Sequence, residues 1–600
     1  AVIFYGQKIN TRYADTNVYW LTAGTQPGLR MAVVDGTPGG AITPANFVAK
    51  LHLEMNLAYL INNPSGPDNN RWYWNAINLP TVGPKTYTVN LANVSTAAGT
   101  ARIRGFFKGY AASPQHHIHV SINGHLILQE FWPARGEFSF DVSIPQSYLV
   151  EGANTILVEG PRTDGITINQ FLVDWFEVDY IKNYAADGPQ TRFSGDNTGS
   201  WEYRITGLGS TDYLTWDITD PLHPVSIANA VFEPSGSTFD LVFQQTIAQK
   251  RQYLACPPAN LQSPVGIVMA GEPELRLASN GADYVMITHR SFTAALQPLA
   301  DYYTSRGLRV KVVDVQDVYD EFSGGVFTPQ AIRDFLAYAY TNWTRPAPSF
   351  VLLVGDGNYD FMNYTGKNDT VFIPPFLFEV DPWMGETDAD NRFVTISGTD
   401  ILPDMALGRL PAQTAADVTA IVEKTLNRYQ HLAGAWANNA LFVAGANDPS
   451  AGNFPVLSDV VIGTYLPASV TVDRVYYGFS PITTGTLAQQ AISTAIHEGR
   501  GLVHFIGHSN PVAWFGDPTN YNSRMFIAPD TIATLANANL YPIFISMTCY
   551  TGYFVQPGVP TLDEQLINAS GIGAAAAWSP TGQGVASGHD LLDAGFFTAI

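Results

Sequence analysis

The chain has 600 residues, of which 14% are charged, and a formal net charge of −21. This acidic balance, without any cluster of Lys and Arg, argues against nucleic acid as a partner. No run of 18 or more apolar residues occurs, so the sequence predicts no transmembrane segment. Charged residues are few while Gly, Pro, Thr, Asn and aromatic residues are plentiful, which favours an extracellular or cell-surface protein.

Residues 1–185 alternate apolar and polar side chains in short segments such as "TARIRGFFKGY", "HLILQEFW" and "FLVDWFEVDYI". Alternation of this period, broken by Gly, Pro and Asn-Gly, predicts an antiparallel β-sandwich. The pattern continues through residues 186–280, in "EYRITGLG" and "FDLVFQQ", and predicts a second, smaller β-rich domain.

Four aromatic residues of the first region could have a ligand-binding role. His117 and His119 share a strand face with a spacing that suits a metal, but no third ligand is evident, so we expect a structural role. Trp72 and Trp74 could form a carbohydrate platform, although core packing is the preferred interpretation.

Residues 281–600 have a different character. Apolar strands such as "ADYVMITH", "FVLLVGDG", "GLVHFIGH" and "YPIFISMTC" alternate with helical stretches such as "PQAIRDFLAYAYTNW". Continuous apolar strands separated by helices predict a mostly parallel sheet covered by helices on both faces. The chain stops inside a helical pattern, so we expect this domain to continue beyond residue 600.

Two strands of this domain end at chemically active side chains. "GLVHFIGH" ends at His508 and "YPIFISMTC" ends at Cys549, 41 residues later (549 minus 508), a length that suits one right-handed crossover. Neighbouring parallel strands would present both side chains at the carboxyl edge of the sheet, where His508 could act as base for the thiol. The pattern alone leaves open that Cys549 is an inert packing residue, as we expect for Cys256.

Five collinear segments carry a family resemblance: "FVLLVGDGNYDF", "LPDMALGRLPAQTAADV", "GLVHFIGHSNPVAWFG", "LYPIFISMTCYTGYF" and "GIGAAAAWSPTGQGVASGHDLLDAGFF". Together they resemble the gingipain-like cysteine peptidases, family C25 of the caspase-like clan, over residues 282–600. The resemblance implies a caspase-like fold, with His508 as general base and Cys549 as nucleophile.

The same resemblance points to the rest of the catalytic apparatus. It implies that the backbone N–H groups of Ser509 and Cys549 form the oxyanion hole, although the family usually has glycine where Ser509 stands. It also implies an acidic partner for the histidine, at a position that Asn447 occupies here with Asp448 beside it. Either Asp448 orients the imidazole or the site is weakened.

Further residues are candidates for substrate and metal binding. By resemblance Asp459 would pair with a basic substrate side chain, although it could instead begin a helix. Trp514, in the segment that follows His508, is a second candidate for substrate contact. The carboxylates expected to bind Ca²⁺, or to remain solvated in acidic loops, are Asp356, Asp360, Glu386 and Asp388.

The sequence therefore predicts a secreted or cell-surface cysteine endopeptidase that acts on protein or peptide substrates, needs no cofactor for its chemistry and contains structural Ca²⁺. The resemblance implies secretion of a bacterial type. The alternatives are a sortase-like transpeptidase of the same family, and a non-catalytic surface or assembly protein, able to self-associate, whose site has decayed.

Overall fold

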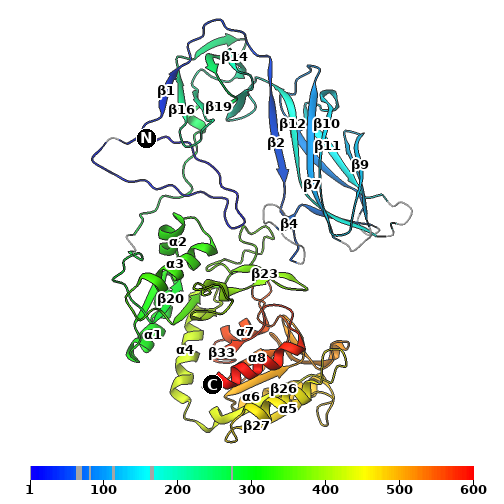
Figure 1. Cartoon of the computed structure of the whole chain (residues 1–600), viewed down its shortest axis with the longest axis vertical. Coiled ribbons are helices and arrows are strands. Elements are labelled where there is room, and N and C mark those ends of the chain that lie inside the picture. The colour runs from blue at the N-terminus through cyan, green and yellow to red at the C-terminus, as the bar shows by residue number, and fades with distance from the viewer. Residues whose placement is uncertain are drawn as a thin grey trace. The chain divides into compact units, whose positions relative to one another are not determined.

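The computed structural model describes residues 2–26, 28–61, 71–79, 83–110, 115–161, 166, 168–271 and 274–599 (Figure 1). The chain forms two compact units: Ala1–Ile9 with Tyr19–Met269, and Asn10–Val18 with Ala270–Ile600. The short segment Asn10–Val18 thus belongs to the second unit, although the residues on both sides of it belong to the first.

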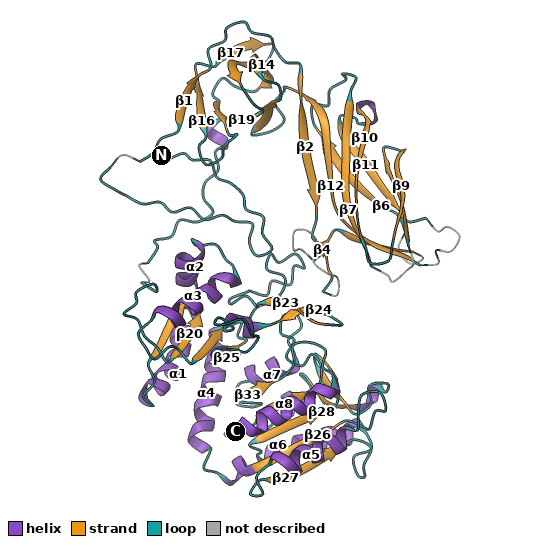
Figure 2. Ribbon diagram, viewed as in Figure 1, coloured by secondary structure: helices purple, strands orange, loops and turns teal. Residues whose placement is uncertain are grey.

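Two antiparallel sheets form most of the first unit (Figure 2). One sheet has the order β10-β7-β12-β2, with β5 also paired to β12, and the other has the order β6-β11-β8-β9. The strands are β2 (Asn46–Glu54), β5 (Asn75–Leu79), β6 (Lys85–Leu91), β7 (Thr100–Gly109), β8 (His116–Ile122), β9 (His125–Trp132), β10 (Glu137–Pro145), β11 (Gly152–Glu159) and β12 (Asn169–Asn183), beside the hairpin of β3 (Ala58–Tyr59) and β4 (Trp72–Tyr73).

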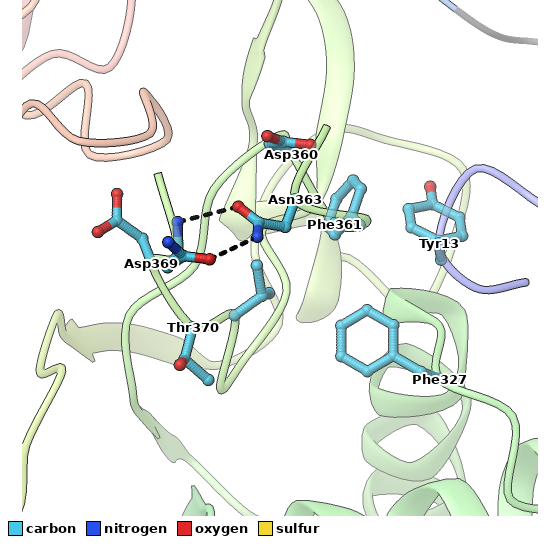
Figure 3. A pocket seen from close by; sticks show the side chains of 9 residues that line it. Tyr13, Phe327, Asp360, Phe361, Asn363, Asp369 and Thr370 are labelled. Carbon is cyan, nitrogen blue, oxygen red and sulfur yellow. Dashed lines mark hydrogen bonds between the residues drawn. The ribbon is translucent and has the colours of Figure 1, made fainter. Parts of the chain in front are cut away.

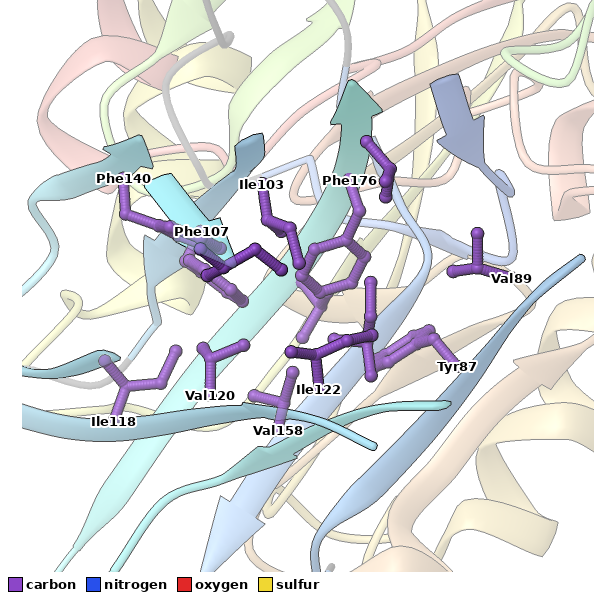
Figure 4. Close-up of a cluster of buried hydrophobic side chains, with 14 of the residues drawn as sticks. Tyr87, Val89, Ile103, Phe107, Ile118, Val120, Ile122, Phe140, Val158 and Phe176 are labelled. Atoms are coloured by element: carbon purple, nitrogen blue, oxygen red, sulfur yellow. The ribbon is translucent and has the colours of Figure 1, made fainter. Parts of the chain in front are cut away.

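Period-two alternation explains why these sheets pack together. In β6, Tyr87, Val89 and Leu91 are buried while the residues between them are exposed. Figure 4 shows side chains from both sheets, among them Phe107 of one sheet and Val120 of the other, meeting in one core. Burial of each large apolar side chain stabilises the fold by roughly 1.5–3 kcal/mol. The predicted β-sandwich is confirmed.

Most of the four candidate ligand-binding residues of the first region are buried or pack against buried side chains. Trp72 is buried, and Trp74 packs edge-on against Tyr87. His117 is also buried and stacks on Phe131, with 4.0 Å between ring centroids. These contacts support the structural interpretation of His117 and the core interpretation of the two tryptophans.

The rest of the first unit is a smaller β region. Its sheets have the orders β1-β16-β15-β19-β13 and β14-β18-β17. The strands are β1 (Ala32–Asp35), β13 (Thr191–Gly195), β14 (Gly199–Leu208), β15 (Leu214–Asp217), β16 (Val225–Ala228), β17 (Val231–Ser235), β18 (Thr238–Ile247) and β19 (Arg251–Cys256). Because β1 pairs with β16, the sandwich does not include all of residues 1–185. Cys256 is fully buried here, as expected for a packing residue.

The second unit begins with a four-stranded, fully parallel sheet of order β21-β20-β22-β25. Along β20, Val285 and Ile287 contribute to the core under α2 and α3, while Met286 contributes to the core under α1 and α4. Both faces are covered, which explains the continuous apolar strands. The elements are β20 (Tyr284–Thr288), α1 (Thr293–Ser305), β21 (Val310–Asp314), α2 (Val315–Ser323), α3 (Pro329–Asn342), β22 (Phe350–Val354), β25 (Ala406–Leu410) and α4 (Ala415–His431).

A second parallel sheet, of order β27-β26-β28-β32-β33, forms the carboxyl-terminal half of this unit. Helix α6 contributes to the core on one face, and helices α5 and α8 border the core on the other. The elements are β26 (Asn439–Ala444), α5 (Phe454–Tyr465), β27 (Thr471–Tyr476), α6 (Gly485–Glu498), β28 (Leu502–Ile506), β32 (Ile543–Met547), α7 (Leu562–Asn568), β33 (Ala576–Trp578) and α8 (Ala586–Ala599). The predicted fold class, β-sandwich followed by α/β domain, is confirmed.

Two small β structures complete the second unit. The hairpin of β23 (Leu377–Asp381) and β24 (Gly385–Asp388) follows the first sheet. The crossover from β28 to β32 carries a three-stranded antiparallel sheet of β29 (His508–Asn510), β30 (Ala513–Phe515) and β31 (Arg524–Ile527), with 3-10 turns. This crossover, all of which the structure describes, contains no α-helix, and β28 and β32 are parallel neighbours as predicted.

Candidate active site

Strand register brings His508 and Cys549 to the same edge of the second sheet. In the pairing of β28 with β32, Ile506 stands opposite Met547. His508 and Cys549 each follow two residues after those partners. Both therefore emerge at the carboxyl ends of adjacent parallel strands, where open α/β sheets form their ligand-binding crevices.

His508 has an acidic partner from the neighbouring strand connection. Its Nε2 lies 2.8 Å from Oδ2 of Asp448, which follows β26, and both side chains are partly exposed. Hydrogen bonds from the Ser450 side chain and amide, followed by the bond from His508, hold the pKa of Asp448 well below its usual range. Asp448 is therefore an ionised acceptor and Nε2 the donor. Asn447 is exposed beside it, so Asp448 is the residue that orients the imidazole.

This tautomer fixes what His508 can do. With its proton on Nε2, the neutral imidazole has an unprotonated Nδ1 that can accept a proton. The Phe454 ring packs perpendicular to the imidazole, with 5.3 Å between centroids, and restricts it from another side. The arrangement of carboxylate, imidazole and strand-end thiol has the composition of a general-base dyad with an orienting acid.

Cys549 is partly buried. Its thiol donates a weak hydrogen bond to the carbonyl of Gly584, with 3.8 Å between Sγ and O. Burial raises the pKa of the Cys549 thiol, and the negative charge of Asp381 raises it further. The resting thiol is therefore protonated at neutral pH, so a base must remove its proton before it can attack a carbonyl.

The Ser509 side chain contacts the backbone of Cys549 directly. The amide of Cys549 donates to Ser509 Oγ at 3.1 Å, and the hydroxyl of Ser509 donates to the carbonyl of the same cysteine. Thr548 Oγ1 lies 2.6 Å from Ser509 Oγ and 2.7 Å from the carbonyl of Gly507. Ser509 was predicted to contribute its backbone amide here, and the structure adds a role for its side chain.

Trp514 is a core residue. None of its surface is exposed, and its ring stacks on Phe505 with 4.4 Å between centroids. Phe526 and Phe544 pack around it. A side chain without exposed surface cannot contact a substrate, so the prediction of a substrate-binding role for Trp514 is wrong.

Asp459 already has an internal cation as its partner. It lies within α5, whose amino-terminal cap is Asn453, so it does not begin the helix. Its Oδ1 accepts from Arg474 at 2.8 Å and from the Tyr476 hydroxyl at 3.0 Å, both on the edge strand β27. A carboxylate that is neutralised in this way presents little net charge to a substrate cation.

The four carboxylates expected to bind calcium have separate partners. Asp356 accepts from Gln413, and Asp360 accepts from the amides of Tyr364 and Thr365. Burial raises the pKa of Asp388 well above its usual range. Among the described residues, no group of three or more His, Cys, Asp or Glu side chains is arranged to hold a metal. These residues therefore do not fit the predicted calcium site.

Glu386 instead binds the amino-terminal segment of the same unit. Arg12 donates from Nη1 to Glu386 Oε1 at 2.5 Å and from Nη2 to Oε2, and both side chains are more than 90% buried. Tyr13 packs edge-on against Phe361 beside this pair. The segment Asn10–Val18 is thus anchored by a bidentate, desolvated ion pair that sequence reasoning missed.

A cavity of about 430 Å³ lies next to this segment (Figure 3). Its lining consists of Tyr13, Phe327 and the loop residues Asp360, Phe361, Asn363 and Asn368 to Val371. Asn363 and Asn368 hydrogen-bond to each other through their side chains, which closes the loop on itself. The lining contains neither His508 nor Cys549, so this cavity is not the catalytic crevice.

An acid-oriented histidine and a cysteine at adjacent strand ends of a helix-covered parallel sheet define an α/β domain of cysteine-peptidase type. A family model of peptidase family C25 matches residues 277–600, which is more than half of the chain. The chain belongs to peptidase family C25, whose members are cysteine peptidases. No curated protein was found to match the chain in sequence.

Several solved structures are similar to the chain. Dimeric latent PorU from Porphyromonas gingivalis is 19% identical with a TM-score of 0.49, and the match covers 68% of this chain and 40% of that one. The Arg-specific cysteine proteinase gingipain R is 21% identical with a TM-score of 0.41, covering 54% and 68% of the two chains. A family 35 carbohydrate-binding module from Clostridium thermocellum is 16% identical with a TM-score of 0.14, covering 23% and 95%.

No helix among the described residues combines the length and apolar character needed to cross a membrane.

Proposed function

We propose that the protein is a cysteine endopeptidase in which Cys549 is the nucleophile and His508 the general base. The observation that carries this proposal is the hydrogen bond from His508 Nε2 to Asp448, which leaves Nδ1 available at the strand end next to Cys549. A peptide or protein is the substrate class that this chemistry serves. The acidic, glycine-rich and aromatic-rich composition supports an extracellular or cell-surface location.

The reaction follows from the two groups. His508 Nδ1 takes the thiol proton while the sulfur forms a bond to the scissile carbonyl carbon, and the π electron pair moves onto the carbonyl oxygen. When that pair returns, the C–N bond breaks and the imidazolium gives its proton to the leaving amine. Water then attacks the thioester while His508 takes a proton from the water, the C–S bond breaks, the acyl group leaves as a carboxylic acid, and His508 returns the proton to the sulfur of Cys549. Asp448 stabilises the imidazolium during these proton transfers.

Hydrolysis of a fluorogenic peptide library tests this function. Cys549→Ala should abolish turnover. Cys256→Ala, the same change at the buried cysteine of the smaller β region, should retain it. The Cys549→Ala chain should keep the circular dichroism of the parent, because a strand-end thiol contributes little core volume. Turnover that survives Cys549→Ala would exclude the proposed nucleophile.

The same assay separates water from an amine as the acceptor. With an oligoglycine amine present, a hydrolase should give mainly free acid, whereas a transpeptidase should give the amine-linked product at the expense of the acid. A preparation that gives neither product would support the interpretation as a non-catalytic surface protein.

A further inference from the structure

The Ser509 hydroxyl hydrogen-bonds to both backbone polar groups of Cys549, its N–H and its carbonyl. It accepts from the amide nitrogen at 3.1 Å and donates to the carbonyl oxygen of the same residue. The hydroxyl of the fully buried Thr548 donates to Ser509 Oγ at 2.6 Å. The hydroxyl therefore has all its hydrogen-bonding capacity in use within the peptide that carries the nucleophile.

The amide that Ser509 engages has a catalytic task in the proposed function. When the sulfur of Cys549 bonds to a carbonyl carbon, the carbonyl oxygen becomes an anion, and the nucleophile's own N–H is a group that can reach it. Effective donors lie about 2.7–3.1 Å from the oxyanion position. Ser509 Oγ lies 3.1 Å from the nitrogen, at the distance where the oxyanion would bind.

We propose that the Ser509 hydroxyl occupies the oxyanion position in the resting protein and that a substrate carbonyl must displace it before the thiol can be acylated. This inference rests on the proposed function. Rotation about the Cα–Cβ bond of Ser509 would free the Cys549 amide, and the Thr548 hydroxyl would then donate its one proton to the carbonyl of Gly507, 2.7 Å away. Ser509 is thus a positioning residue that limits acylation.

Two reagents for the same thiol distinguish this role from a merely structural one. Iodoacetamide alkylates the sulfur by displacing iodide and forms no oxyanion. A peptidyl aldehyde adds the sulfur to its carbonyl carbon, and the resulting hemithioacetal oxygen requires the oxyanion donor. If Ser509 blocks that donor, its removal should affect the second reaction and leave the first nearly unchanged.

The experiment measures both reactions in the full chain carrying Ser509→Ala, Ser509→Gly or Ser509→Thr. Ser546→Ala, which deletes a buried hydroxyl on β32, the strand that leads to Cys549, is the matched control. The aldehydes are short peptides that end in Arg, Lys, Leu or Ala. We expect Ser509→Ala and Ser509→Gly to bind aldehyde on the order of tenfold more tightly or better. Ser509→Thr and Ser546→Ala should behave like the parent, and the iodoacetamide rate should vary by less than about twofold throughout.

Four results would overturn the proposal. Aldehyde binding that weakens in Ser509→Ala and Ser509→Gly would make the hydroxyl an oxyanion donor, and unchanged binding would give it no role; both outcomes leave the peptidase function intact. Equal acceleration of alkylation and aldehyde addition would indicate general loosening of the site. Absence of Cys549-dependent aldehyde binding in every variant would end this proposal and the proposed function together.

Discussion

Asp448 and His508 are 60 residues apart in the chain and are joined by a hydrogen bond of 2.8 Å. Each follows a strand of the same sheet, and the two strands, β26 and β28, are parallel neighbours. The carboxylate fixes the imidazole tautomer and leaves Nδ1 unprotonated, as the proposed base role requires. The chemistry of the site depends on this contact as much as on the thiol.

Replacing Asp448 with Asn should lower kcat by about 100-fold or more. The amide keeps the shape but can donate to Nε2, which favours the wrong tautomer and does not stabilise the imidazolium. Asn447→Ala is the control, because Asn447 is exposed beside Asp448, and it should change kcat by less than about threefold. Steady-state kinetics measure both, and equal losses in the two variants would contradict the assignment of Asp448.

The rate at which Cys549 reacts should continue to rise with pH above the pKa of an ordinary free thiol. Burial and the charge of Asp381 raise the thiol pKa, so the reactive thiolate forms only as the pH approaches that raised value. Asp381→Asn removes the negative charge, lowers the thiol pKa and should move the alkylation curve to lower pH. The control is Asp400→Asn in an exposed loop. A rate that is already on a plateau below pH 7 would show a thiolate–imidazolium pair and contradict this account.

Arg12→Ala should loosen the hairpin of β23 and β24. The change leaves the buried carboxylate of Glu386 without its bidentate partner, which costs roughly 3 kcal/mol or more in comparable buried pairs. Hydrogen–deuterium exchange should become faster in peptides covering residues 10–18 and 377–388. Arg30→Ala, at an exposed arginine of the first unit, should leave these peptides unchanged. Unaltered exchange in Arg12→Ala would mean that the ion pair does not hold the segment.

Asp459→Asn should leave the preference between Arg and Leu before the scissile bond unchanged within about twofold. The carboxylate is already paired with Arg474 and accepts from Tyr476, so it has little charge to offer a substrate. The ratio of kcat/KM for matched Arg and Leu peptides measures the effect. A tenfold or larger loss that is confined to the Arg peptide would restore Asp459 as the specificity residue.

Strand patterns predicted that His508 and Cys549 lie at adjacent strand ends, because the placement of each residue is local. An apolar run that ends in a reactive side chain indicates a strand end. The length of the crossover indicated that β28 and β32 are neighbours. The sequence could narrow the partner of the histidine only to Asn447 or Asp448, because the backbone of the loop decides which side chain turns toward the imidazole. The fold class followed from the change of apolar period near residue 281.

Burial and long-range pairing account for the errors. Trp514 is next to the site in sequence, but its side chain packs into the core of the second sheet against Phe505. Glu386 was grouped with nearby carboxylates as a calcium ligand, whereas its partner Arg12 is 374 residues away. No local sequence pattern predicts such a pair. Nor does one predict that β1 pairs with β16 in the smaller β region. The Ser509 contact required the side-chain geometry of two adjacent strand ends.

Covalent labelling followed by mass spectrometry tests the central claim most directly. A peptidyl acyloxymethyl ketone, applied to the full chain, should form an adduct on Cys549 and leave Cys256 unmodified. The adduct should be lost in His508→Ala and greatly reduced in Asp448→Asn, because the thiol then lacks its oriented base. Equal labelling of the two cysteines, or labelling of Cys549 that persists at the same rate in His508→Ala, would contradict the assignment of a catalytic dyad.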